Sequence, residues 1–101
     1  MDRDEIYRDC IADIKAIKSL FEERRWRDVP LARQRLMNLK GKWGELVRRF
    51  KGTEVERVIQ EAATRLPKAN TQPDQAWLCH LYDTEGDFTF HLNQRDGTPG
   101  S

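Results

Sequence analysis

Residues 76–92, AWLCHLYDTEGDFTFHL, decide the predicted fold class, because their pattern differs from the helical periodicity of the rest of the chain. Apolar and polar residues partly alternate on both sides of residues 83–86, a stretch with good turn chemistry. Pairing residue 82 with residue 87 places six apolar side chains on one face of a β-hairpin: Trp77, Cys79, Leu81, Phe88, Phe90 and Leu92. An isolated hairpin is marginal in water, so this face is expected to pack on the rest of the chain or on a partner.

An amphipathic helix is expected over residues 3–25, where apolar side chains recur at steps of three and four. Asp2 or Asp4 can serve as its N-cap, and Glu5 follows Asp2 by three residues, as in a capping box. Negative charge in the first turn also suits the positive end of the helix dipole. This is the strongest helical signal in the chain.

A second amphipathic helix is expected over residues 29–50. Asp28 is a suitable N-cap, and Pro30 is tolerated in a first turn, where its missing N–H is not needed. Gly41 and Gly44 interrupt the segment, and each costs about 1 kcal/mol relative to alanine in a helix interior. A kink or break is therefore expected near residues 40–44.

A shorter third helix is expected from Thr53, which forms a capping box with Glu56, to Pro67, which ends it. The elements together predict a single α+β, mainly helical domain over residues 1–93. It contains two long antiparallel helices, the shorter third helix and a C-terminal β-hairpin at residues 76–92. The polar tail, residues 94–101, is expected to be disordered.

The location predicted from the sequence is cytoplasmic. The N-terminus is acidic, whereas a secretory signal needs a basic start and an apolar stretch. No run approaches the roughly 18 apolar residues that span a membrane, so no membrane partner is expected. Cys10 and Cys79 lack C-x-x-C spacing, so they are expected to be free, mostly buried thiols. A disulfide between them would need an oxidising compartment.

Charge is distributed unevenly along the chain. The whole sequence carries 18 basic and 17 acidic residues, a net charge of +1. Residues 1–23 hold four basic and seven acidic groups, residues 24–51 hold ten and two, and residues 52–101 hold four and eight. The three segments therefore carry net charges of −3, +8 and −4.

The basic middle segment supports the leading hypothesis on function. A small non-catalytic regulatory or accessory protein would use its basic second helix to bind an anionic partner, with nucleic acid or a nucleic-acid-handling complex as the first candidate. Alternatively, these cations flank a buried stripe and pair with the acidic helices on either side. The candidate binding residues are Arg33, Arg35, Lys40, Lys42, Arg48, Arg49 and Lys51.

A second hypothesis comes from the amphipathic helices. Three apolar stripes and an apolar hairpin face can leave more apolar surface than one small chain can bury. The protein would then be a protein–protein interaction module, such as an inhibitor, antitoxin or immunity-like protein, or a homo-oligomeric assembly subunit. Its contact surface would be the helical hairpin or the strand edge.

A third hypothesis, a metal-dependent enzyme, rests on His80 and His91. In the expected hairpin they lie diagonally on one face, near Tyr82 and Asp87, and two imidazoles with a carboxylate can bind zinc or act as a base. However, H-x-x-x-H spacing, paired cysteines and an oriented nucleophile are all missing from the sequence. No catalytic residue, metal or cofactor is therefore expected.

Overall fold

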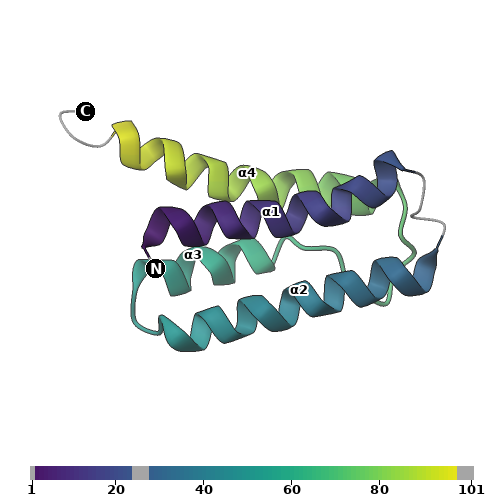
Figure 1. The fold of residues 1–101 in the computed structure, drawn as a ribbon, viewed down its shortest axis with the longest axis horizontal. Helices are drawn as coiled ribbons and strands as arrows, with labels where there is room; N and C mark the ends of the chain where they lie inside the picture. The colour runs from purple at the N-terminus through teal and green to yellow at the C-terminus, as the bar shows by residue number, and fades with distance from the viewer. Residues whose placement is uncertain (1, 24–27, 98–101) are drawn as a thin grey trace.

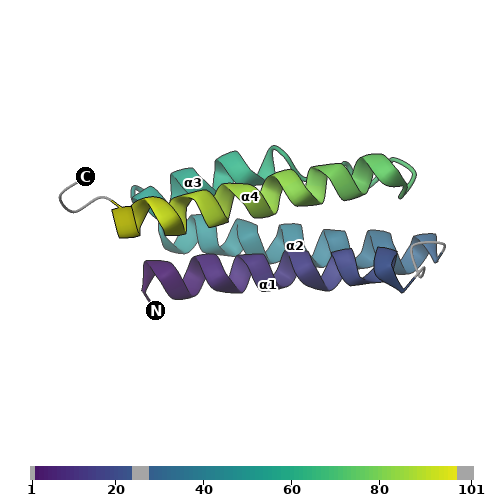
Figure 2. The ribbon, with the colours of Figure 1, turned by 90° about the horizontal axis from the view of Figure 1, so that it is seen from above.

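The described part of the chain folds as an antiparallel four-helix bundle (Figure 1). A computed structural model describes residues 2–23 and 28–97. Within them lie α1 (Arg3–Glu22), α2 (Val29–Arg49), α3 (Glu54–Ala63) and α4 (Gln75–Gly97). Successive helices run in opposite directions, and α1 packs against α4 as well as α2, which closes the ring. As a result α2 and α4 lie diagonally across the bundle from each other (Figure 2).

All four helices contribute buried side chains to the core, and an aromatic cluster lies within it. The rings of Trp43 on α2 and Phe88 on α4 pack edge to face, with their centroids 5.3 Å apart. Tyr7 on α1 lies 5.7 Å from Phe88, so three helices contribute aromatic rings to one cluster. Edge-to-face pairs stabilise a core beyond the area that they bury.

The three predicted N-caps are confirmed. Their side-chain oxygens accept hydrogen bonds from the backbone amide three residues further on, at 2.9 Å for Asp2, 3.2 Å for Asp28 and 3.4 Å for Thr53. Between α2 and α3 the chain turns at Gly52, whose φ of +85° lies in the left-handed region that favours glycine. Local signals therefore predicted the starts of the first three helices correctly.

The expected break near residues 40–44 is not found, because α2 continues through them. Trp43, Leu39 and Leu46 are buried on the inner face of the same segment. Burial of a large aromatic side chain contributes more than the helix propensity that the two glycines cost. Packing therefore outweighs the local preference of Gly41 and Gly44.

The predicted α+β class and its C-terminal β-hairpin are wrong. Residues 75–97 form the continuous helix α4, and no described residue lies in a strand. The buried side chains of α4 are Trp77, Leu81, Thr84 and Phe88, spaced by four, three and four residues, which is the helical period. Three of these four also fit the predicted hairpin face, so apolar spacing alone did not separate the two structures.

Thr84 is the residue that conceals the helical stripe in the sequence. It is polar but fully buried, and its hydroxyl donates a hydrogen bond to the His80 carbonyl at 2.7 Å. A threonine can satisfy its hydroxyl within its own helix in this way. At the start of α4, the Asp74 carboxylate accepts a hydrogen bond from the Ala76 amide at 2.9 Å. Residues 83–86 therefore continue a helix that Asp74 helps to begin.

Residues 64–74 connect α3 to α4 and complete the bundle beside the first half of α2. The Thr71 carbonyl accepts a hydrogen bond from the Arg33 guanidinium at 3.3 Å, and its hydroxyl accepts one from Trp77 Nε1 at 2.8 Å. Leu66, Pro67 and Pro73 are buried.

Residues 94–97, expected in the tail, are helical, and residues 98–101 lie outside the described part. None of the described helices has the length and apolar character needed to cross a membrane.

Candidate anion-binding groove between α1 and α2

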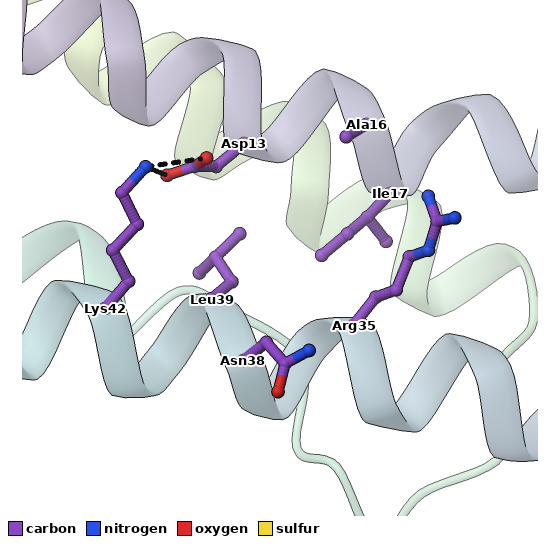
Figure 3. Close-up of a pocket in the computed structure, with 7 residues that line it drawn as sticks. All are labelled: Asp13, Ala16, Ile17, Arg35, Asn38, Leu39 and Lys42. Carbon is purple, nitrogen blue, oxygen red and sulfur yellow. Dashed lines mark hydrogen bonds and ion pairs between the residues drawn. The ribbon is translucent and has the colours of Figure 1, made fainter.

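A groove of about 200 Å³ lies between α1 and α2 (Figure 3). Its floor is apolar, because the buried side chains of Ile17 and Leu39 face each other across it. Two predicted basic residues stand at its ends, Arg35 at one and Lys42 at the other. The lining residues are Asp13, Ala16, Ile17, Arg35, Asn38, Leu39 and Lys42.

The Lys42 end of the groove is neutralised by the chain itself. Lys42 Nζ lies 2.8 Å from the Asp9 carboxylate and 3.1 Å from that of Asp13. Burial lowers the pKa of Lys42, but hydrogen bonds to the two carboxylates outweigh it, and the pKa is raised overall. Asp13 also accepts a hydrogen bond from Trp43 Nε1 at 3.3 Å, which anchors it to α2. At this position the alternative expectation, pairing with the acidic first helix, is confirmed.

The Arg35 end of the groove is not neutralised in this way. Arg35 is exposed, and it forms no hydrogen bond or ion pair within residues 2–23 and 28–97. Its guanidinium extends toward α1 where that helix carries Ala16 and Ile17, which have no charge (Figure 3). The Asn38 side-chain oxygen accepts a hydrogen bond from Gln34 at 2.9 Å, so the Asn38 NH₂ group can donate to a ligand. An arginine can bind a carboxylate or a phosphate through two parallel hydrogen bonds.

Three more of the predicted residues lie at or just beyond the C-terminal end of α2. Arg48 pairs with Glu45 on the same helix, and this contact lowers the pKa of the Glu45 carboxyl. Arg49 is exposed, with its guanidinium 5.6 Å from the centre of the Phe50 ring. Lys51 is exposed just beyond the helix. None of these three residues lines the groove between α1 and α2.

The remaining two predicted residues lie on the opposite flank of α2. The Arg33 guanidinium is held by the Thr71 carbonyl. Lys40 is partly buried in a second groove of about 310 Å³ between α2 and α3, and burial lowers its pKa. The strip of α2 between its two flanks is exposed and uncharged at Gln34, Met37 and Gly41. The seven predicted residues therefore do not form one continuous basic surface.

The histidine site proposed from the hairpin is not formed. His80 and His91 are eleven residues apart on one helix, about 16 Å along its axis, instead of being neighbours on a sheet. The His91 ring packs near Tyr7, with centroids 6.2 Å apart. In the described part of the chain, no cluster of three or more His, Cys, Asp or Glu side chains could hold a metal ion.

Both cysteines are free, but their surroundings differ. Cys10 is fully buried in the core, and burial together with Asp13 and Asp9 raises its thiol pKa to about 12. Cys79 is exposed on α4. The expectation of mostly buried thiols is therefore wrong for Cys79, because that residue faces solvent on a helix and not Phe90 across a hairpin.

The groove contains residues that the sequence did not single out. Asp9 and Asp13 are four residues apart on one flank of α1, a spacing that puts both on one side of a helix. The sequence shows this spacing, but it does not show that the two carboxylates face α2. No family model, curated protein or solved structure matches the chain. What the groove can bind is therefore argued from its floor, its donors and its charges.

Proposed function

We propose that this protein is a small non-catalytic binding module that holds an acidic segment of a partner protein in the groove between α1 and α2. The observation that carries this proposal is the guanidinium of Arg35, which has no partner among the described residues and lies beside an apolar floor. A carboxylate of the partner would bind Arg35 and the Asn38 amide, and an adjacent apolar side chain would cover Ile17 and Leu39. Interfaces commonly combine an apolar centre with a few polar groups that fix orientation.

The charges of the groove favour an acidic protein segment over nucleic acid. A nucleic-acid backbone presents a row of phosphates and needs several available cations. In the groove, Lys42 is already occupied by Asp9 and Asp13, whose carboxylates would lie close to any phosphate passing beyond Arg35. A short acidic and apolar segment requires only one available cation.

Nucleic acid remains a second candidate because residues 24–51 carry a net charge of +8. Arg35 and Arg49 are both exposed and lie about 21 Å apart along α2. Phosphate contacts at both would give affinity that falls steeply as salt rises. Fluorescence anisotropy with labelled single-stranded and double-stranded oligonucleotides at several salt concentrations tests this candidate.

The proposed function is tested by capturing partners on the immobilised protein, with and without nuclease treatment. The wild type should retain a nuclease-resistant protein partner, and Arg35→Glu should lose it. Lys68→Glu is the matched control, because Lys68 is exposed, lies away from the groove and has no side-chain hydrogen bond or ion pair in the described part. The proposal is wrong if nuclease removes the bound material, or if Arg35→Glu captures as much as Lys68→Glu.

A further inference from the structure

A second groove, the α2–α3 groove, lies on the other flank of α2 from Arg35. Its volume is about 310 Å³, and α3 packs beside the second half of α2 along it (Figure 1). The lining residues are Lys40, Trp43, Gly44, Val47, Ile59, Gln60 and Ala63. Most of them are apolar, and among them only Lys40 is charged. A mostly apolar pocket of this size with a few polar groups is typical of a small-molecule site.

Lys40 is a partly buried cation without a counterion in the described part of the chain. Lys18 and Lys42, which also lie against neighbouring helices, are both paired with carboxylates. Lys40 forms no hydrogen bond or ion pair within residues 2–23 and 28–97. Burial alone lowers the pKa of its ammonium group, with no described carboxylate close enough to raise it. Because a charge removed from water is normally paired, this end of the groove fits an added anion.

The acidic residues of α3 are engaged outside the groove. The Glu56 carboxylate accepts a hydrogen bond at 2.9 Å from a backbone amide in the turn before α3. Glu61 pairs with Arg57 within α3 at 3.4 Å. Glu54 lies 3.8 Å from Arg3 on α1. None of these three carboxylates lines the groove, so its lining presents a positive charge to a ligand without a competing negative one.

We propose that the α2–α3 groove binds a small carboxylate ligand with an aromatic or short aliphatic body. The ligand carboxylate pairs with the Lys40 ammonium group and accepts a hydrogen bond from the Gln60 amide. Gln60 is exposed, and its side chain forms no hydrogen bond to any described residue. The apolar body covers Val47 and Ile59, and the removal of apolar surface from water stabilises the complex. This site is separate from the groove at Arg35 and does not depend on the partner proposed there.

Gly44 contributes open space to the groove. It belongs to the lining, and apart from the backbone of its own helix no described atom lies within 4 Å of the position that a Cβ would take there. A large side chain at this position therefore occupies space that the ligand needs. Gly41 is equally open, but it is exposed on the strip of α2 that lines neither groove. Substituting both glycines separates the effect of filling the groove from that of replacing a helical glycine.

The first test titrates the protein with 4-phenylbutyrate and follows the amide chemical shifts by NMR. Saturable shifts should be centred on residues 40–47 and 59–63. The uncharged analogue 4-phenylbutyramide should bind about tenfold more weakly or worse, because it cannot form the ion pair with Lys40. Equal affinities for the two compounds would overturn the proposal. Shifts centred on Arg35 and α1, or no saturable shifts at all, would overturn it as well.

The second test repeats the 4-phenylbutyrate titration on two pairs of variants, each checked for folding by urea denaturation. Lys40→Gln should weaken binding by about tenfold or more. Lys51→Gln, which removes the same charge from an exposed residue outside the groove, should leave the affinity unchanged. Gly44→Leu should abolish binding, and Gly41→Leu should bind like the wild type. The proposal is wrong if Lys40→Gln binds as tightly as Lys51→Gln. It is also wrong if a folded Gly44→Leu chain binds as tightly as Gly41→Leu.

Discussion

Helices α2 and α4 occupy opposite corners of the bundle and expose different chemistry. On α2 the exposed residues are mostly basic or uncharged. The neighbouring helix α1 supplies carboxylates that neutralise Lys42, whereas Arg35 has no partner in the part of the chain that the structure describes. On α4 the exposed residues include the aromatic side chains of Tyr82 and Phe90, and two of its carboxylates, Glu85 and Asp87, are paired with Lys18 and Arg65. In both cases pairing within the chain determines which groups remain for a partner. Counting charges along the sequence does not determine this.

The largest expected difference is in thiol reactivity, and it tests whether α4 is a helix at all. Cys79 should react with a thiol reagent at the rate of an exposed cysteine. Cys10 should react slower by a factor on the order of a thousand, because it is reached only when the core opens. Its raised pKa, about 12, also keeps it protonated well above neutral pH.

The measurement is the time course of thiol modification in native buffer and again in urea. Cys79→Ser should abolish the fast phase, and Cys10→Ser should abolish the slow one. Equal protection of both cysteines would contradict the helical assignment, because a hairpin places Cys79 against Phe90 in an apolar face.

The next largest effect separates the two faces of α4. Phe88→Ala should lower the free energy of unfolding by about 3–5 kcal/mol, because it leaves a cavity against Trp43 and Tyr7. Phe90→Ala, two residues away on the outer face, should change it by about 0.5 kcal/mol or less, because Phe90 is exposed. Urea titrations followed by circular dichroism measure both. Similar losses for the two variants would contradict the burial pattern of α4.

A smaller effect on the free energy of unfolding is expected for substitutions of two acidic residues, Asp13 on α1 and Asp83 on α4. Asp13→Ala should cost about 1–3 kcal/mol of unfolding free energy, because Trp43 Nε1 loses its hydrogen-bond acceptor inside the bundle. Asp83→Ala on α4 is the control, and it should be nearly neutral because Asp83 is exposed and unpaired in the described part. If Asp13→Ala proves as neutral as this control, Asp13 does not anchor α1 to α2.

The smallest effect concerns the glycines of the two helices. Gly41→Ala on α2 should stabilise the chain by up to about 1 kcal/mol, since no neighbouring atom obstructs a Cβ there. Gly86→Ala on α4 should give a similar gain, since no atom of the described chain outside its own helix obstructs a Cβ there either. Urea titrations followed by circular dichroism measure the free energy of unfolding of both variants. A loss of stability in either variant would contradict the open space at that position.

Much of the fold was predictable from local signals, and the error in α4 has a specific physical cause. The caps at Asp2, Asp28 and Thr53 act within three residues, so a sequence reveals them. In α4, Trp77, Leu81 and Phe88 suit both a hairpin face and a helical stripe. The residue that decides between them is Thr84, which is polar and yet buried.

The candidate site was predictable only in part. The excess of basic residues on the second helix was visible, and it led to Arg35 and Lys42 among the candidates. Whether each of the two side chains is paired within the chain was not predictable, because pairing depends on which residues of α1 lie opposite each one. Asp9 and Asp13 meet Lys42, whereas the uncharged Ala16 and Ile17 lie beside Arg35.

The most direct test of the account compares Arg35→Gln with Arg49→Gln in partner affinity. Both residues are exposed arginines on α2, and both changes remove one positive charge. Loss of a hydrogen bond to a charged group costs about 1.5–3 kcal/mol, so Arg35→Gln should weaken binding by about tenfold or more. Arg49→Gln should bind like the wild type. Equal losses of affinity for the two variants would contradict the account, because they would show that the partner binds a distributed basic surface and not the groove at Arg35.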